Sequence, residues 1–177
     1  QEPRPPIWIG ANKDYGVKRS VEIGDAWLIN PHEANDTISR QLGLIRDAKS
    51  APDSTRFQNC QPAFKNAFVA DTDKRAFETF GPHMEEMFDW YKQAGQHKAT
   101  ETPSDFDLEF NELQDQRALV GSVDTVADQA VYLYEEFGID CIIFSMHFPG
   151  VDQDALHESI RLAGEEVVPQ VRERIET

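Results

Sequence analysis

The chain contains only two cysteines among its 177 residues, Cys60 and Cys141, and they do not form a C-x-x-C pair. A framework of disulfides is therefore excluded. Cys141 lies inside the apolar run Ile139–Phe144, where a thiol behaves as a small hydrophobic group.

Positive charge is also scarce, because 17 Lys and Arg stand against 32 Asp and Glu, for a formal charge of -15. Such a chain repels phosphate backbones and anionic lipid, so nucleic acid is excluded as a partner class. No run approaches the roughly 20 apolar residues of a membrane span, and residues 1–6 lack the basic and apolar regions of a signal peptide. We expect a cytoplasmic protein without a membrane partner, and we expect that Gln1 is not the original start of translation.

Two common kinds of catalytic motif are missing. There is no H-E-x-x-H pattern, and Asp152-Gln-Asp154 lacks the glycine and terminal Glu of a calcium loop, so no metal site is expected. Neither Ser122 nor Ser145 stands in a G-x-S-x-G motif, which argues against a serine nucleophile of that type.

What is present is a recurring strand-then-helix pattern in a single domain spanning residues 1–177. Right-handed crossovers between such units give a parallel α/β architecture. A closed (β/α) barrel needs about eight units in about 250 residues, so this chain supplies half of one. The strands are predicted near Ile7–Gly10, Ala26–Asn30, Phe64–Val69 and Ile139–Ser145, the last covered on both sides.

Helical spacing follows each predicted strand, and Pro169 should kink the last helix. The aromatic residues from Phe77 to Tyr91 are expected to pack in the core along one helix. Residues 98–119 are polar and acidic, and they predict a connecting excursion with one short helix. Helix caps are expected at Asn35 or Asp36, at Asp71 or Thr72 and at Ser122, and the last helix is expected to begin near Asp154.

The loop from Gly10 to Gly16 follows a strand and opens a helix, so its backbone N–H groups and the helix dipole could converge on a phosphate. The same residues also suit an ordinary turn between a strand and a helix. In that reading Asn12 is only a cap and Lys13 is a solvated charge beside Asp14.

Residues just past the strand ends are candidates for a flavin-ring or substrate face, because barrel active sites lie at that end. They are Met146 and His147 after the most apolar strand, and Asn30 after the second. The structural alternative for His147 is a hydrogen bond to the backbone. The other histidines read as surface or helix positions without an assigned role: His32, His83, His97 and His157.

Several loose motifs occur in order along nearly the whole chain. They are Pro5–Ala11, Arg19–Trp27, Phe68–Asp73, Val120–Val126, Gly138–Cys141 and Glu165–Pro169. Together they resemble the bacterial-luciferase-like flavin-dependent monooxygenase family, whose pattern is an apolar strand, a Gly-Gly-Ser-like loop, a helix and Gly-Asp-Gly-Trp. The resemblance implies a TIM (β/α)8 barrel of which this chain supplies about the last four βα units.

The resemblance also implies that the phosphate of FMN is held by the loop after the family's fifth strand. Here Ala11 replaces a frequent glycine, Asn12 a frequent serine, and Ala26 the second glycine of Gly-Asp-Gly-Trp. Other flavin and substrate contacts in the family come from the first four strands. The implied phosphate contacts in this chain are Gly10, Ala11, Asn12, Lys13 and Gly16.

The function implied is a flavin-dependent monooxygenase that oxygenates a small organic substrate, with no catalytic residue assigned. Relatives use a deazaflavin coenzyme for hydride transfer, and the residues do not decide between the two cofactors. A non-catalytic flavin-binding or assembly module and an unrelated phosphate-binding α/β domain also remain open. The partners implied are the missing N-terminal half or a partner chain, a flavin reductase, and further copies of the same chain.

Overall fold

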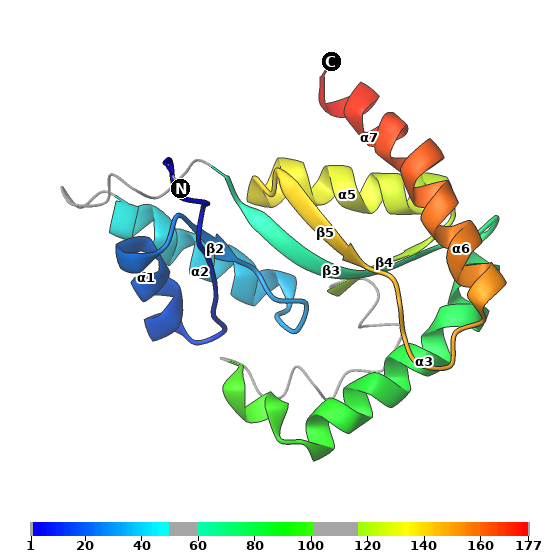
Figure 1. Ribbon diagram of the computed structural model, residues 1–177, viewed down its shortest axis with the longest axis horizontal. Coiled ribbons are helices and arrows are strands. Elements are labelled where there is room, and N and C mark those ends of the chain that lie inside the picture. The colour runs from blue at the N-terminus through cyan, green and yellow to red at the C-terminus, as the bar shows by residue number, and fades with distance from the viewer. Residues whose placement is uncertain (1, 50–59, 101–116, 177) are drawn as a thin grey trace.

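The computed structural model describes residues 2–49, 60–100 and 117–176 (Figure 1). Strands and helices alternate along these residues. Their order is β1 (Trp8–Gly10), α1 (Asp14–Ile23), β2 (Ala26–Leu28), α2 (Asn35–Lys49), β3 (Pro62–Val69), α3 (Asp73–Gln93), a 3-10 helix η1 (Gln96–Ala99), β4 (Ala118–Gly121), α5 (Val123–Phe137), β5 (Cys141–Ser145), α6 (Gln153–Leu162), η3 (Ala163–Val167) and α7 (Val168–Ile175).

All the strand pairs that the structure describes are parallel, as the sequence predicts. β1 pairs with β2, β3 pairs with both β4 and β5, and an isolated bridge from Ile29 to Ala63 joins the two groups. The amide of Phe64 donates to Ile29, and the amide of Ala70, an even number of residues further on, donates to Gly121. Amides separated by an even number of residues point to the same edge of a strand. β2 and β4 therefore follow one another along one edge of β3, and β5 occupies the other.

Two hydrophobic clusters lie on opposite faces of β3 because successive side chains alternate. Ala63, Ala67 and Val69 belong to the cluster beneath α1, α2 and α5. Phe68 and Ala70 belong to the cluster beneath α3. In Figure 1, α5 and α3 accordingly lie on the two sides of β3.

Two of the expected helix caps are confirmed by their hydrogen bonds. The side chain of Thr72 accepts from the amide of Arg75 at 3.2 Å, and Ser122 accepts from the amide of Thr125 at 3.4 Å. α6 begins one residue earlier than expected, with the Asp152 carboxylate as its cap. The expected cap for α2 was wrong, since that helix already begins at Asn35.

The kink expected at Pro169 takes the form of a change in helix type. The five residues of η3 form a π-helix, and Pro169 then sits in the first turn of α7. Proline has no N–H to donate to the carbonyl four residues earlier. A wider turn just before it accommodates that loss without ending the helix.

Two predictions about the second half of the chain need correction. The excursion predicted over residues 98–119 ends earlier, because Ala118 and Leu119 belong to the strand β4; residues 101–116 lie outside the described part of the chain. β5 is not covered on both sides in this structure, since the Ile143 side chain is 36% exposed. Among the described helices, none is long and apolar enough to cross a membrane.

Candidate functional site

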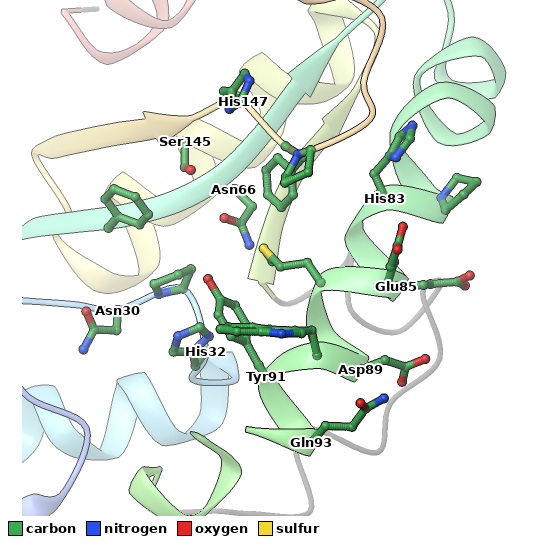
Figure 2. Close-up of a pocket in the computed structure, with 18 of the residues that line it drawn as sticks. Asn30, His32, Asn66, His83, Glu85, Asp89, Tyr91, Gln93, Ser145 and His147 are labelled. Carbon is green, nitrogen blue, oxygen red and sulfur yellow. The ribbon is translucent and has the colours of Figure 1, made fainter. Parts of the chain in front are cut away.

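A cavity of about 1190 Å³ lies where the carboxyl ends of β2 and β5 and the middle of β3 face α3 (Figure 2). We call it the strand-end cavity. Parallel strands bring their carboxyl ends to one edge, which is where ligand sites form in (β/α) folds. Its lining comes from the end of β2 (Leu28, Asn30, Pro31, His32), from β3 (Phe64, Asn66), from the end of β5 (Ser145, His147, Phe148, Pro149) and from α3 (Pro82, His83, Glu85, Glu86, Met87, Asp89, Trp90, Tyr91, Gln93).

The structure brings two of the three expected strand-end residues to this cavity. Asn30 and His147 both line it, Asn30 from the segment after β2 and His147 from the segment after β5 (Figure 2). Met146 does not line it and instead packs against both hydrophobic clusters. Side chains alternate along an extended chain, so neighbours such as Met146 and His147 face different surroundings.

The loop between β1 and α1 (residues 11–13) lies beside the cavity rather than in its lining. Its backbone is fixed from two directions. The indole N–H of the fully buried Trp27 donates to the carbonyl of Ala11 at 2.9 Å, and the Gln41 side chain donates to the carbonyl of Asn12 at 2.7 Å. These contacts use the carbonyl oxygens of the loop, so they do not occupy its amides.

α1 begins directly after the loop with no side-chain cap. Its N-cap residue, Lys13, is extended and makes no capping hydrogen bond with its side chain. The Lys13 ammonium donates instead to the backbone carbonyl of Thr100. A helix end without a side-chain cap keeps its first amides available for an anion.

Gly16 lies in the first turn of α1, close beneath the loop. A Cβ atom at Gly16 would stand 3.0 Å from the Cβ atom of Ala11. A larger side chain at this position would therefore displace the loop from the helix. Both residues belong to the set that the resemblance implies for the flavin phosphate.

The negative charge of Asp14, in the same turn, is balanced. Arg40 donates to both of its carboxylate oxygens, at 2.7 and 2.8 Å, and holds the pKa of Asp14 below its usual range. Gln41 donates to the same carboxylate at 3.2 Å. An anion approaching the helix end would thus meet a paired carboxylate rather than a bare one.

One side-chain contact connects the loop to the cavity. The amide nitrogen of Asn30 donates to the side-chain oxygen of Asn12. Asn30 lines the cavity and Asn12 belongs to the loop, so two residues predicted separately form one unit.

Asn66, in the middle of β3, is a cavity residue that the sequence analysis missed. It is buried and lines the strand-end cavity, and its amide nitrogen has no hydrogen-bond partner among the described residues. A buried amide without a partner costs free energy unless a ligand or water accepts from it. Its sequence signal was a pair of polar residues, Lys65 and Asn66, within an otherwise apolar strand.

His32 was expected at the surface without a role, but it lies in the cavity wall. Its ring meets the rings of Phe88 and Tyr91 edge to face, at 6.2 and 5.1 Å between centroids. Burial, with a smaller contribution from the nearby Arg117, lowers the pKa of His32 to about 4. His32 is therefore neutral at pH 7. Its position just after β2, like that of Asn30, was the signal that could have found it.

α3 divides its aromatic stripe between the core and the cavity. Phe80, Met84 and Phe88 are buried in the core as expected, whereas Tyr91 and the 61% exposed Trp90 line the cavity. Helical spacing alone could not separate these two groups. In the described ranges no group of three or more His, Cys, Asp or Glu side chains could hold a metal ion.

The parallel strands alternating with helices define an α/β domain of the (β/α)-barrel kind, and the strand-end cavity with the uncapped helix beside it is its candidate site. A model of the family "Luciferase-like monooxygenase" matches residues 1–141. The chain belongs to the luciferase-like monooxygenase family.

Solved structures of this family type share the fold over nearly the whole chain. The monooxygenase RslO1 from Streptomyces bottropensis is 20% identical, with a TM-score of 0.70 over 96% of this chain and 49% of its own length. The oxygenating constituent of 3,6-diketocamphane monooxygenase from Pseudomonas putida, solved with FMN, is 20% identical, with a TM-score of 0.68 over 94% of this chain and 49% of its own. The coenzyme F420-dependent tetrahydromethanopterin reductase from Methanopyrus kandleri is 18% identical, with a TM-score of 0.59 over 94% of this chain and 51% of its own length.

The chain thus spans about half the length of the solved structures it matches. A search of curated protein sequences gave no match.

Proposed function

We propose that the chain forms the C-terminal half of a flavin-dependent oxidoreductase barrel, in which the β1–α1 loop and the start of α1 hold the phosphate of FMN. The Asn12–Asn30 contact carries this proposal, because it ties the anion-binding end of a helix to the wall of a large cavity. A flavin needs such a pair of sites, one for its phosphate and one for its ring.

The residues of the loop fit a phosphate. The carbonyls of Ala11 and Asn12 are held by Trp27 and Gln41, so the backbone is fixed before a ligand arrives. A helix N-terminus stabilises an anion by about 0.3–1 kcal/mol at an exposed site, and more when partly buried. Backbone geometry therefore contributes more than the Lys13 charge, whose ammonium already contacts Thr100.

The cavity residues then orient the ring and the substrate. Reduced flavin, when bound, supplies the electrons for the reaction of oxygen with a small organic substrate. Asn66 offers a buried N–H donor, the neutral His32 and Tyr91 offer ring surfaces, and α3 covers the strand ends against water.

The other half of the barrel is part of the proposal. One edge of β1 and one edge of β5 have no strand partner in the part of the chain that the structure describes. Open strand edges are pairing sites, and a barrel removes them by closing. We infer that an N-terminal half, a partner chain or a second copy supplies the missing strands.

The proposal is tested by titrating the protein, in its native assembly, with FMN and with riboflavin, which lacks the phosphate. FMN should bind at least about tenfold more tightly, a difference of about 1.4 kcal/mol. Equal affinity for FMN and riboflavin would contradict the proposed phosphate site. Coenzyme F420 is the third ligand in this titration, because F420-dependent enzymes share the fold. Tighter binding of F420 than of FMN would identify F420 as the cofactor, bound at the same site.

A further inference from the structure

The side chain of Asn66 brings an unused hydrogen-bond donor to the strand-end cavity. The residue is 3% exposed, and its amide nitrogen has no hydrogen-bond partner among the described residues. A buried donor without an acceptor is costly, so native structures generally supply an acceptor from protein, water or a ligand. Since the described residues supply none, a molecule in the cavity is the natural acceptor.

Ser145 of β5 places a second polar group beside Asn66. The two residues are register partners in the parallel pairing of β3 with β5, and both side chains line the cavity (Figure 2). Neighbouring strands lie about 4.8 Å apart. One oxygen atom between the two side chains can therefore accept from the amide N–H and from the hydroxyl together. We call these two side chains the Asn66–Ser145 pair.

The rest of the lining decides which kind of acceptor fits. Leu28 and Phe64 are apolar neighbours of the pair in the cavity wall. No Lys or Arg lies in the described lining, whereas α3 contributes the acidic residues Glu85, Glu86 and Asp89. Such a wall disfavours an anion, because negative charge would meet negative charge without a cation to compensate it. A neutral oxygen, such as that of a carbonyl group, accepts hydrogen bonds without this penalty.

We propose that the Asn66–Ser145 pair binds one neutral carbonyl oxygen, which makes Asn66 a specificity-determining residue of the strand-end cavity. The inference rests on the proposed function, because the carbonyl belongs either to the flavin ring or to the organic substrate. A ligand that places a hydrocarbon group there leaves the buried amide unpaired and binds about tenfold more weakly.

Asn66→Leu tests the pair, because leucine has nearly the shape of asparagine but no N–H group. The protein, in its native assembly, is titrated with riboflavin as the probe that carries ring carbonyls. Cyclohexanone is the second probe, compared by ligand-observed NMR with methylenecyclohexane, in which a CH2 group replaces the carbonyl oxygen. Gln170→Leu is the control, since it removes an exposed amide that contacts Asp124.

The two probes distinguish the two sources of the carbonyl. If the flavin ring supplies it, Asn66→Leu weakens riboflavin binding at least about tenfold. If the substrate supplies it, riboflavin binding is kept and the wild-type preference for cyclohexanone over methylenecyclohexane is lost. Ser145→Ala causes a smaller loss in the same arm, and Gln170→Leu keeps the wild-type behaviour with both probes.

Urea unfolding of the ligand-free protein separates binding from packing. Asn66→Leu should not lower the midpoint, because it removes a buried donor that has no partner. A lower midpoint would identify Asn66 as a packing residue and would contradict the proposal.

The proposal is overturned if Asn66→Leu keeps both the riboflavin affinity and the preference for cyclohexanone, as it would if only water accepted from the amide. It is overturned equally if the wild type binds neither probe. Failure of the proposed function gives a different result, in which riboflavin does not bind the wild type but the preference for cyclohexanone still depends on Asn66.

Discussion

Asn30, at the end of β2, donates a hydrogen bond from its side chain to the side-chain oxygen of Asn12 in the loop after β1. The two residues are 18 positions apart, and the parallel pairing of β1 with β2 brings their strand ends together. The contact joins the loop proposed for the phosphate to a cavity large enough for a flavin ring and a small substrate.

Replacing Asn30 by Ala should therefore weaken FMN binding about tenfold, because the loop loses a side-chain tie next to the proposed phosphate position. Riboflavin binding should change less. Fluorescence titration of both ligands measures the difference. Gln170→Ala is the control, since it removes an exposed amide contact to Asp124 at 2.8 Å. Equal losses for FMN and riboflavin would show that Asn30 acts on the cavity alone.

His32 makes the fold sensitive to acid. Its pKa in the folded protein is about 4, below the value of 6.5 of an unperturbed histidine. The unfolded chain therefore takes up a proton at a higher pH than the folded one. The contribution of the neutral His32 to the free energy of unfolding is fully present above pH 6.5. It falls by up to about 3 kcal/mol as the pH drops to 4.

His32→Phe should flatten this part of the profile, because phenylalanine keeps a ring against Phe88 and Tyr91 and cannot take up a proton. Urea unfolding between pH 7 and pH 4 compares the two proteins. The assignment is wrong if the mutant loses as much stability over this interval as the wild type.

Asp73, in the first turn of α3, stabilises the start of α5. Its carboxylate accepts from the amide of Ser122 at 2.6 Å, and this bond, followed by one from the Thr125 hydroxyl, lowers the pKa of Asp73. Asp73→Ala should cost roughly 1.5–3 kcal/mol of unfolding free energy at pH 7. A carboxyl group with a lowered pKa loses its contribution as the pH falls below about 4, so the mutant and the wild type should converge in acid.

Asp71→Ala provides the matched control for Asp73. Asp71 forms an exposed ion pair with Arg75 one helical turn away, and such pairs contribute only about 0.3–0.5 kcal/mol. Similar losses for the two substitutions in denaturant unfolding would contradict the proposed link between α3 and α5.

The chain alone should associate with itself or with a partner. β5 presents a partly exposed face that includes Ile143, and the described parts of β1 and β5 each keep one unpaired edge. Exposed apolar strands tend to pair with other chains. Sedimentation velocity over a range of concentrations measures this association. A well-folded monomer at all concentrations would contradict the inference that half of a barrel is missing.

The sequence predicted those features that depend on local patterns. Capping residue types located the starts of α3, at Asp71 or Thr72, and of α5, at Ser122. Apolar runs located four of the parallel strands that the structure describes. β4 was missed because Ala118–Gly121 directly follows a long polar stretch and its pairing with β3 is not local. A four-residue apolar run next to a polar stretch does not show that it pairs with a strand as distant in the sequence as β3.

The candidate site was predicted only in part, for a similar reason. Asn30 and His147 were found because residues after strands gather at one end of a parallel sheet. The residues of α3 that line the cavity could not be found, since helical spacing does not say whether a ring such as Trp90 meets the core or a cavity.

The most direct test of the proposed phosphate site is the ratio of the FMN and riboflavin affinities in Gly16→Val. A valine there would push against Ala11 and displace the loop, whereas the control Gly43→Val would place its Cβ no closer than 3.8 Å to a neighbouring side chain. Lys13→Ala should cause a smaller, salt-sensitive loss. We predict that Gly16→Val removes most of the preference for FMN and that Gly43→Val keeps it. An unchanged ratio in Gly16→Val would contradict the account.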